Sequence, residues 1–337
     1  MKWLLRIAGG LLALLVIAFL ILRTPDTNPA EMRAKYGGAP SQFVKLGNGL
    51  TVHLRDEGPR NAPVIILLHG SNADLHTWQP WVDALTAEYR VIRFDQRGHG
   101  LTGPAPDGDY SNAAFVSDIE AVAGALGVGR FVLGGNSMGG GLTVAYALAH
   151  PDRLDGMVLV DAGGAPVQRK SGGNIGFTIA RLPFINRLAE HVTPRSMVES
   201  SFRQSVTNQQ IATPQVIDRY WELLRYPGNR AATVKRFGQP RVPFSEQQMA
   251  SLDIPALVLW GAEDAIIPVE AGRWFDRVLP ASTLIEYQGV GHLPHEEAAG
   301  QSLSDLQTWL GQVMPAIPPE LRGRHSAANS ARLGGVA

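Results

Sequence analysis

Short apolar segments recur through the middle of the chain and alternate with stretches typical of helices. Each segment is five or six residues long and is followed by a loop that contains glycine. Continuous apolar runs of this length are typical of strands that are buried on both faces. The segments are residues 64–68, 90–95, 130–134, 157–161, 256–260 and 283–287. Their alternation with helices predicts a parallel sheet covered by helices on both faces.

A different pattern precedes these segments. Residues 43–46 and 50–54 flank a Gly-Asn-Gly turn at residues 47–49, which predicts a β-hairpin. Before the hairpin, residues 24–40 are rich in proline and glycine, and we expect them to form a linker.

The alternation of strands and helices stops between residues 165 and 251. This segment has no continuous apolar strand, and prolines interrupt its helical stretches. The pattern therefore predicts one α/β unit in two parts, residues 41–164 and 252–314, with a helical segment inserted between them. Residues 315–337 combine prolines with a mixture of small and polar residues, which predicts a disordered tail.

The N-terminus contains an uncharged apolar run from residue 7 to residue 22. About 20 apolar residues span a bilayer, and three more apolar residues extend this run beyond Arg6. No small-x-small cleavage site follows, so we expect residues 1–23 to be an uncleaved transmembrane signal anchor. Secretion after signal cleavage is the alternative. Lys2 and Arg6 predict a cytoplasmic N-terminus and a catalytic domain that faces the periplasm or the exterior.

Composition narrows the possible partners and chemistry. The chain has 337 residues, a hydrophobic content of 45% and a formal net charge of zero, which fits an ordinary globular core and does not favour nucleic acid as a partner. It contains no cysteine, which excludes disulfides, thiolate catalysis and cysteine-ligated zinc. Metal clusters, phosphate loops and dinucleotide fingerprints are also missing from the sequence, so we expect no metal and no cofactor.

One serine lies between glycines where an apolar strand is followed by a helix. Residues 135–139 read Gly-Asn-Ser-Met-Gly and follow directly on the apolar run at residues 130–134. A serine held at a strained strand-to-helix turn needs small neighbours, because its flanks press against the adjacent strand and helix. The pattern predicts that Ser137 is a catalytic nucleophile.

The surrounding loops strengthen this interpretation. Loops that read His-Gly-Ser-Asn, Gln-Arg-Gly-His-Gly, Gly-Ala-Glu-Asp and Gly-Val-Gly-His follow four of the apolar segments, at residues 69–72, 96–100, 261–264 and 289–292. With the serine motif, they make the chain similar to the α/β-hydrolase family over about residues 41–313. The resemblance implies an α/β-hydrolase fold, in which helices flank a mostly parallel eight-stranded sheet.

This resemblance also implies a helical cap, inserted after strand 6 at residues 165–251. Apolar residues of the segment would either form the underside of the cap or pack its own small core. They are Phe177, Ile179, Leu182, Phe184, Phe202, Tyr220, Trp221, Leu224 and Tyr226.

A serine hydroxyl needs a base within hydrogen-bond reach before it can attack a carbonyl. His292 is the candidate, because it follows the last strand in a glycine-rich loop, where the family places its histidine. His295 is the rival, although its position is better suited to the start of the final helix.

Asp264 is the candidate for the acid that orients His292 and stabilises the imidazolium. It lies in a turn that closely resembles the acid turn of the family, after the strand at residues 256–260. Glu263 is a weaker candidate. Asp161 is the main competitor, because some members of the family carry their acid after the preceding strand.

The resemblance places the oxyanion hole at two backbone N–H groups. One belongs to Met138, directly after the nucleophile and at a helix N-terminus. The other belongs to Ser71, directly after His69-Gly70. We expect His69 and His99 to have structural roles.

The leading hypothesis is a serine hydrolase that cleaves small to medium uncharged carboxylic esters through an acyl-enzyme. Its partner would be a small-molecule ester, with membrane attachment through the N-terminal helix. One alternative is suggested by residues 135–140, which resemble the nucleophile segment of hydrolases that cleave carbon–carbon bonds in ring-opened aromatic products. Two features depart from those enzymes: residues 71–74 are not glycine-rich, and Leu293 replaces an aromatic residue. A cofactor-free haloperoxidase-like side activity and a non-enzymatic binding role are further alternatives.

Overall fold

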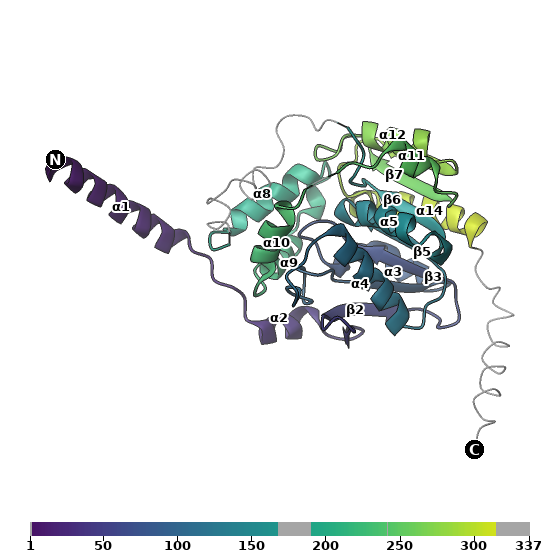
Figure 1. The fold of residues 1–337 in the computed structure, drawn as a ribbon, viewed down its shortest axis with the longest axis horizontal. Coiled ribbons are helices and arrows are strands. Elements are labelled where there is room, and N and C mark those ends of the chain that lie inside the picture. Colours follow the sequence, from purple (N-terminus) through teal and green to yellow (C-terminus); the bar gives the residue numbers. More distant parts are fainter. Residues whose placement is uncertain (1, 168–189, 241, 315–337) are drawn as a thin grey trace, which may run out of the picture.

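The apolar segments form strands of one mixed sheet in the computed structural model, which describes residues 2–167, 190–240 and 242–314 (Figure 1). The strand order is β1-β2-β4-β3-β5-β6-β7-β8. The strands are β1 (Gln42–Lys45), β2 (Thr51–Glu57), β3 (Val64–Leu68), β4 (Arg90–Phe94), β5 (Phe131–Asn136), β6 (Leu154–Val160), β7 (Ala256–Gly261) and β8 (Ser282–Tyr287). Strand β2 is antiparallel to β1 and β4, and all other neighbouring pairs are parallel. The mostly parallel eight-stranded sheet is therefore confirmed.

Strands β1 and β2 form the predicted hairpin, with Phe43 opposite His53 and Lys45 opposite Thr51. Strand β3 lies between β4 and β5 in the middle of the sheet. The parallel strands β3, β5, β6, β7 and β8 all end at the same edge of the sheet. In open α/β sheets, ligands bind outside this edge. Here the loops that carry the candidate site residues follow β3, β5, β7 and β8.

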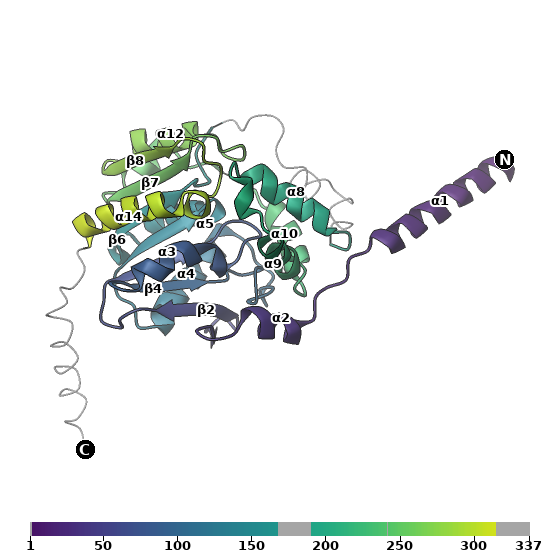
Figure 2. The ribbon, with the colours of Figure 1, turned by 180° about the vertical axis from the view of Figure 1, so that it is seen from behind.

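Helices cover both faces of the sheet (Figures 1 and 2). Buried residues of α3 and α14 pack against one face, and buried residues of α4, α5 and α12 pack against the other. These five helices are α3 (Gln79–Leu85), α14 (Ala299–Val313), α4 (Asn112–Ala125), α5 (Met138–Ala149) and α12 (Glu270–Val278). Shorter elements are α13 (Pro294–Glu297) and the 3₁₀ helices Leu75–Trp78, Pro151–Arg153 and Gln209–Ile211.

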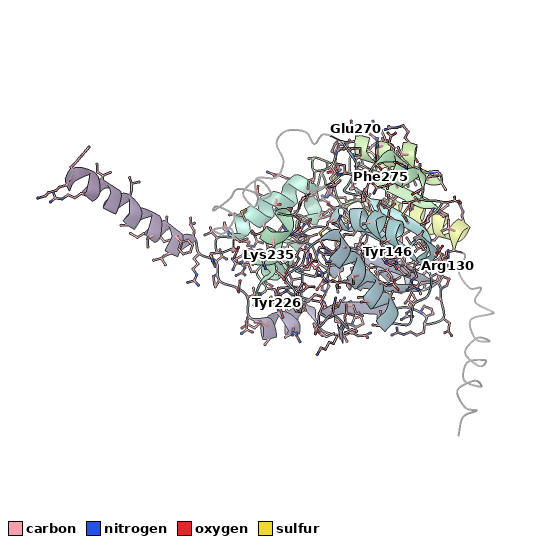
Figure 3. All side chains as sticks on the ribbon, viewed as in Figure 1. Arg130, Tyr146, Tyr226, Lys235, Glu270 and Phe275 are labelled. Carbon is pink, nitrogen blue, oxygen red and sulfur yellow. The ribbon has the colours of Figure 1, made fainter. Side chains whose placement is uncertain are left out.

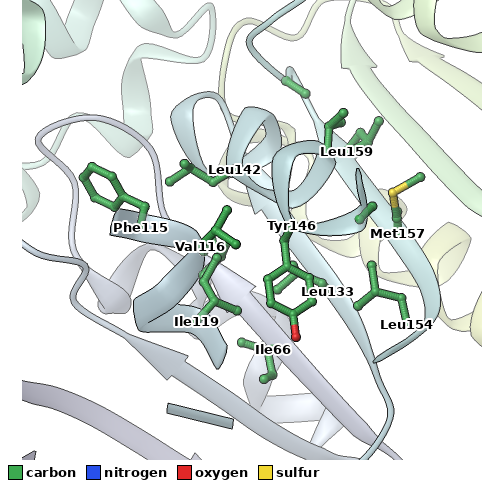
Figure 4. Packing of buried hydrophobic residues seen from close by; sticks show 14 of the residues in the cluster. Ile66, Phe115, Val116, Ile119, Leu133, Leu142, Tyr146, Leu154, Met157 and Leu159 are labelled. Atoms are coloured by element: carbon green, nitrogen blue, oxygen red, sulfur yellow. The ribbon is translucent and has the colours of Figure 1, made fainter. Parts of the chain in front are cut away.

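Strand β3 shows why the parallel strands are apolar throughout. Ile66 and Leu68 pack toward α4 and α5, whereas Ile65 and Leu67 pack toward α3 and α14. Successive side chains of a strand point to opposite faces, so a strand covered on both faces needs apolar residues at every position. Figure 4 shows the first of these two cores, where Ile66 and Leu133 of the sheet lie beside Tyr146 of α5.

In the described residues between β6 and β7 the chain forms four helices, which are called the inserted helices below. They are α8 (Arg195–Ser205), α9 (Pro214–Leu224), α10 (Asn229–Phe237) and α11 (Glu246–Ala250). The described part of residues 165–251 contains helices and no strand, as the sequence pattern predicts. Phe202 and Tyr220 pack edge to face, with ring centroids 5.0 Å apart, inside a small cluster of these helices. The predicted cap residues Phe177, Ile179, Leu182 and Phe184 lie outside the described residues, as does the predicted tail.

Helix α1 (Lys2–Leu22) extends away from the rest of the chain, and several of its apolar side chains are exposed (Figure 1). Lys2 and Arg6 lie in its first turns, so its uncharged part covers only residues 7–22. At 1.5 Å per residue this part is about 24 Å long, which is less than the roughly 30 Å of a hydrocarbon core. No helix in the described part of the chain is long and apolar enough to cross a membrane. The predicted signal anchor at residues 1–23, with its membrane attachment and its periplasmic or exterior catalytic domain, is therefore wrong.

The predicted linker at residues 24–40 contains helix α2 (Pro29–Tyr36) and contacts the inserted helices. Arg230 of α10 donates a hydrogen bond to the Thr24 carbonyl (2.8 Å) and forms an ion pair with Asp26 (2.6 Å). The Tyr36 hydroxyl donates to Glu222 of α9 (2.7 Å). These contacts hold the segment against α9 and α10.

The turn between β5 and α5 has no space for side chains on its glycines. A Cβ on Gly139 would lie 2.2 Å from the Leu68 carbonyl oxygen, and a Cβ on Gly135 would lie 2.3 Å from the Gly139 carbonyl carbon. Both contacts are with backbone atoms, which cannot move aside as a flexible side chain can. The start of α5 can therefore approach β3 this closely only because these positions are glycine.

Gly139→Ala should destabilise the fold by about 1–3 kcal/mol or more, because the new methyl group collides with the end of β3. Urea unfolding followed by circular dichroism measures the change. Gly311→Ala is the matched control, since a Cβ at this exposed position of α14 meets nothing within 4 Å. The control should be neutral or stabilising by about 0.5–1 kcal/mol, because alanine favours a helix over glycine. Equal stability of the two variants would contradict the packing argument.

Candidate active site

Ser137 occupies the sharp turn between β5 and α5. Its backbone has φ 54° and ψ −111°, an uncommon conformation for a residue with a side chain. Its N–H donates to the Val160 carbonyl at the end of β6 (2.9 Å). Its own carbonyl accepts from the N–H groups of Gly141 (3.1 Å) and Gly163 (2.8 Å). These three hydrogen bonds hold the strained turn in place.

His292 and Asp264, the predicted base and acid, form a hydrogen-bonded pair. His292 Nδ1 and Asp264 Oδ2 are 2.6 Å apart, and both side chains are almost fully buried. The other oxygen of Asp264 accepts from the N–H groups of Ile266 (2.7 Å) and Ile267 (3.0 Å), which fixes the carboxylate. Because Nδ1 faces Asp264, the remaining ring nitrogen of His292 is Nε2. His292 and Ser137 line the same cavity, so the fold brings the three predicted residues to one edge of the sheet.

Two of the three competing residues, His295 and Glu263, make other contacts. His295 is fully buried, and its ring lies 4.4 Å from the Trp78 ring, centroid to centroid, with Nε2 3.0 Å from Thr77 Oγ1. Burial, with a smaller contribution from His292, lowers the pKa of His295 to about 3, so this ring is neutral. Glu263 accepts a hydrogen bond from the Val290 N–H (3.1 Å) and so supports the loop that carries His292.

Asp161 lies behind the pair, directly after β6, and is fully buried. Burial, and then the negative charge of Asp264, raise the pKa of Asp161 well above its usual range. Donor atoms of Asp161, Asp264 and His292 lie within 4.8 Å of one another, so among the described residues this cluster could hold a metal ion. The 2.6 Å separation of His292 Nδ1 and Asp264 Oδ2 is, however, that of a charge-assisted hydrogen bond.

The predicted oxyanion loop is held by helix α10. Arg236 Nη1 donates to the Ser71 hydroxyl (2.9 Å), and Thr233 donates to the Asn72 side-chain oxygen (2.9 Å). Asn72 adopts φ 60°, which turns the chain sharply after Ser71. Met138 begins α5 on the other side of Ser137, and both Ser71 and Met138 line a cavity with Ser137.

His69 and His99 have structural positions, as expected. His69 is buried between its own loop and the next, with Nδ1 donating to the Gly70 carbonyl (2.8 Å) and Nε2 accepting from the Gln96 N–H (3.1 Å). His99 Nδ1 donates to the Arg97 carbonyl (3.0 Å). Burial, followed by the nearby charge of Arg236, lowers the pKa of His99 well below its usual range.

Three residues that sequence reasoning missed hold the histidine loop. The Asn136 amide donates to the carbonyls of Val160 (3.2 Å) and His292 (3.1 Å). The Ser205 carbonyl, at the end of α8, accepts the His292 N–H (2.7 Å). Glu297 accepts the Gly291 N–H (3.0 Å). Asn136 could have been noticed, since it precedes the serine in the motif, but a partner so distant in sequence leaves no local signal.

Ser137 lines two cavities. In the view of the whole molecule, side chains crowd the region between the inserted helices and the sheet (Figure 3). The first has a volume of about 160 Å³ and also contains His292. Its wall is mainly apolar and includes Met197, Val198, Phe202, Leu224 and Leu293. The second has a volume of about 430 Å³ and is bounded by Met138, Arg236, Phe237 and Phe244. A substrate that reaches Ser137 can therefore extend in two directions.

Comparison with known proteins agrees with this architecture. The sequence profile of the alpha/beta hydrolase fold matches residues 63–299. That match covers well over half of the chain, and the sheet order and the turn at Ser137 fit it. The chain belongs to the α/β-hydrolase fold family.

Relatives within the family have differing activities. A protein from Burkholderia vietnamiensis named 2-hydroxy-6-oxononadienedioate/2-hydroxy-6-oxononatrienedioate hydrolase is 30% identical over 277 residues, which cover 77% of this chain and 92% of the relative. The structure of a thermophilic esterase from Thermogutta terrifontis is 28% identical, with a TM-score of 0.69 and coverage of 82% and 99%. The structure of a membrane phospholipase A is 25% identical, with a TM-score of 0.71 and coverage of 94% and 100%.

His295 should make stability depend on pH. Its pKa is about 3 in the folded protein and about 6.5 in an unfolded chain. Between about pH 3 and pH 6.5, therefore, the unfolded state binds the proton and the folded state does not. Its contribution is complete above pH 6.5 and falls by about 1.4 kcal/mol per pH unit toward pH 3. Urea unfolding of the parent protein and of His295→Gln checks this. The difference in unfolding free energy between them should shrink by about 2 kcal/mol from pH 7 to pH 5. Parallel curves would disprove it.

Proposed function

We propose that this chain is a hydrolase that cleaves a carbon–carbon bond in ring-opened aromatic products, with Ser137 as the nucleophile. His292 takes the Ser137 proton through Nε2, and Asp264 orients the ring through Nδ1 and stabilises the imidazolium. The 2.6 Å contact between His292 and Asp264 and the cavity that His292 shares with Ser137 support these roles.

The oxyanion hole is assigned to the N–H groups of Ser71 and Met138. Both residues line the cavity beside Ser137, and Met138 begins a helix, where the helix dipole favours negative charge. Donors fixed in this way stabilise the tetrahedral intermediate by about 3 kcal/mol each. Hydrogen bonds from α10 to Ser71 and Asn72 support the loop that carries one of these donors.

The reaction proceeds in two steps on the keto tautomer of the substrate, which has a ketone at one end, a carboxylate at the other and a saturated carbon next to the ketone. A 2-hydroxy-6-oxo dienoate reaches this form when the proton of its 2-hydroxyl is lost and that carbon gains a proton. Addition of Ser137 Oγ to the ketone gives a tetrahedral intermediate. The adjacent carbon–carbon bond then breaks, and its electron pair is delocalised into the conjugated carboxylate-bearing fragment, which receives the proton from His292. Water, activated by His292, hydrolyses the remaining acyl-enzyme to a carboxylic acid and regenerates Ser137.

The observation that carries this substrate class is the position of Arg236. Arg236 lines the second cavity and is only 8% exposed. Its Nη1 donates to the Ser71 hydroxyl (2.9 Å), so a positive charge lies next to the proposed oxyanion hole. A ring-opened product carries a carboxylate, which a guanidinium binds through charge-assisted hydrogen bonds. The relative from Burkholderia vietnamiensis supports the same class, since its name describes a hydroxy-oxo-dienedioate hydrolase. These observations favour carbon–carbon cleavage over the uncharged-ester hypothesis.

Ester hydrolysis is the second candidate, because the first cavity is lined mainly by apolar residues and suits a small acyl chain. The likeness to the Thermogutta terrifontis esterase points in the same direction. Both reactions need the same nucleophile, base and oxyanion donors, so the substrate distinguishes them.

A 2-hydroxy-6-oxo dienoate should be cleaved with a kcat/KM at least about tenfold above that for p-nitrophenyl butyrate, because only the dienoate offers Arg236 a carboxylate. The loss of dienoate absorbance and the release of p-nitrophenol measure the two rates. Ser137→Ala should lower both by a factor on the order of 10⁶. Ser117→Ala, an exposed position on α4, is the matched control and should be unchanged. A clear preference for the ester would favour the second candidate.

Arg236→Met should raise KM for the dienoate by about 10- to 100-fold, because a hydrogen bond to a charged group contributes about 1.5–3 kcal/mol. The same substitution should change kcat/KM for p-nitrophenyl butyrate much less, and Arg236→Lys should recover part of the dienoate affinity. Steady-state kinetics on both substrates provide the test. An equal loss on both substrates would show that Arg236 only supports the Ser71 loop.

A further inference from the structure

Asp161 has no role in the proposed mechanism, yet it lies next to the residues that do. It directly follows β6, its side chain is fully buried, and its backbone adopts φ 45°. Its Oδ1 accepts a hydrogen bond from the Gly261 N–H (3.1 Å), which aims the carboxyl at the end of β7. Donor atoms of Asp161, Asp264 and His292 lie within 4.8 Å of one another.

The second oxygen of Asp161 has no donor. Asp161 Oδ2 is buried, and no group in the described part of the chain gives it a hydrogen bond. A buried carboxylate oxygen without a donor is costly, whereas a protonated carboxyl carries its own donor. An oxygen of the Asp264 carboxylate lies within 4.8 Å of an oxygen of Asp161, and a side-chain hydrogen bond between the two carboxyls contributes to raising the pKa of Asp161.

We propose that Asp161 is a positioning residue, whose protonated carboxyl donates a hydrogen bond from Oδ2 to the Asp264 carboxylate and so fixes the acid that orients His292. Asp264 is then held on three sides. Two backbone N–H groups bind its Oδ1, His292 Nδ1 binds its Oδ2, and Asp161 approaches from β6. The inference rests on the proposed roles of His292 and Asp264.

The groups that face Asp161 favour its neutral form. These groups are Asp264 after β7, Glu297 in α13 and Tyr287 at the end of β8. The negative charges of Asp264 and Glu297 disfavour a second negative charge on Asp161. Burial contributes most to raising the pKa of Asp161, and the charge of Asp264 follows. His292 is the cationic group of the cluster when it is protonated, and Asp264 lies against its ring. One negative charge in this dry cluster suffices for an imidazolium, and a second would be repelled by the first.

The test uses the full chain and three variants: Asp161→Asn, Asp161→Ala and Ser137→Ala. Asparagine has nearly the same shape as a protonated aspartate and can donate the same hydrogen bond, whereas alanine cannot. A fluorophosphonate probe reports the reactivity of Ser137 without depending on the substrate class. Infrared difference spectra at neutral pH, parent minus Asp161→Asn, report the C=O stretching band of a protonated carboxyl. Thermal unfolding checks that each variant is folded.

We expect Asp161→Asn to label at nearly the parental rate, with the same pH profile, and Asp161→Ala to label about 10- to 100-fold more slowly, because Asp264 is no longer held in place. The infrared band should be present in the parent and lost in Asp161→Asn. The ¹H resonance of His292 Nδ1–H should move in Asp161→Ala and stay in Asp161→Asn.

Three results would overturn the inference. A loss of about 10⁴-fold in Asp161→Asn would mean that Asp161 is itself the ionised acid. Parental labelling by Asp161→Ala would mean that it positions nothing, and the absence of the infrared band would mean that it is not protonated. If Asp161→Ala fails to fold, the labelling rate of Asp161→Asn and the infrared band still test whether Asp161 is protonated and not itself the ionised acid. Equal labelling of the parent and Ser137→Ala would instead refute the proposed nucleophile, and the infrared band would remain a separate test of Asp161.

Discussion

The main chain of Ser137 is bound at both ends, and this constraint fixes the site. Its N–H is bonded to the end of β6, and its carbonyl is bonded to Gly163 in the loop that follows β6. A backbone at φ 54° persists only where the surrounding structure holds it. Here the hold comes from β6 on one side and from the close approach of α5 to β3, through Gly139, on the other. The hydroxyl of Ser137 therefore projects from a rigid turn, to which the other loops are fitted.

The loop that carries His292 is fitted to this turn by contacts from distant segments. The Asn136 side chain donates a hydrogen bond to the His292 carbonyl, so the residue before the serine also helps to position the backbone of His292. The Ser205 carbonyl bonds the His292 N–H, which makes the end of α8 a support for the loop. Because α10 likewise supports Ser71, the inserted helices stabilise the site as well as cover it. Changes in these helices can therefore alter the geometry at the serine as well as the shape of the cavities.

Burial determines the charge state of the groups around the site. His69, His99 and His295 have lowered pKa values because their rings are fully enclosed, so burial favours the neutral form of each. The charge on Arg236 lies beside the proposed oxyanion loop, where its attraction for an anion is weakly screened. The same enclosure that suppresses charge on the buried histidines strengthens the few charged contacts that remain.

Local sequence patterns determined the architecture and predicted the nucleophile. Strands buried on both faces require continuous apolar runs, and the serine turn requires glycines. Both features can therefore be recognised from residues that are adjacent in the sequence. Local patterns also marked His292, but its choice over His295 was decided by tertiary structure. Of these two histidines, His292 contacts the Asp264 carboxylate, whereas His295 contacts the Thr77 hydroxyl. The N-terminal run was misread because hydropathy alone did not weigh its short uncharged length. The role of Arg236 could not be predicted from neighbouring residues. The inserted helices bring Arg236 to Ser71, which is distant in the sequence, so only the tertiary structure determines that contact.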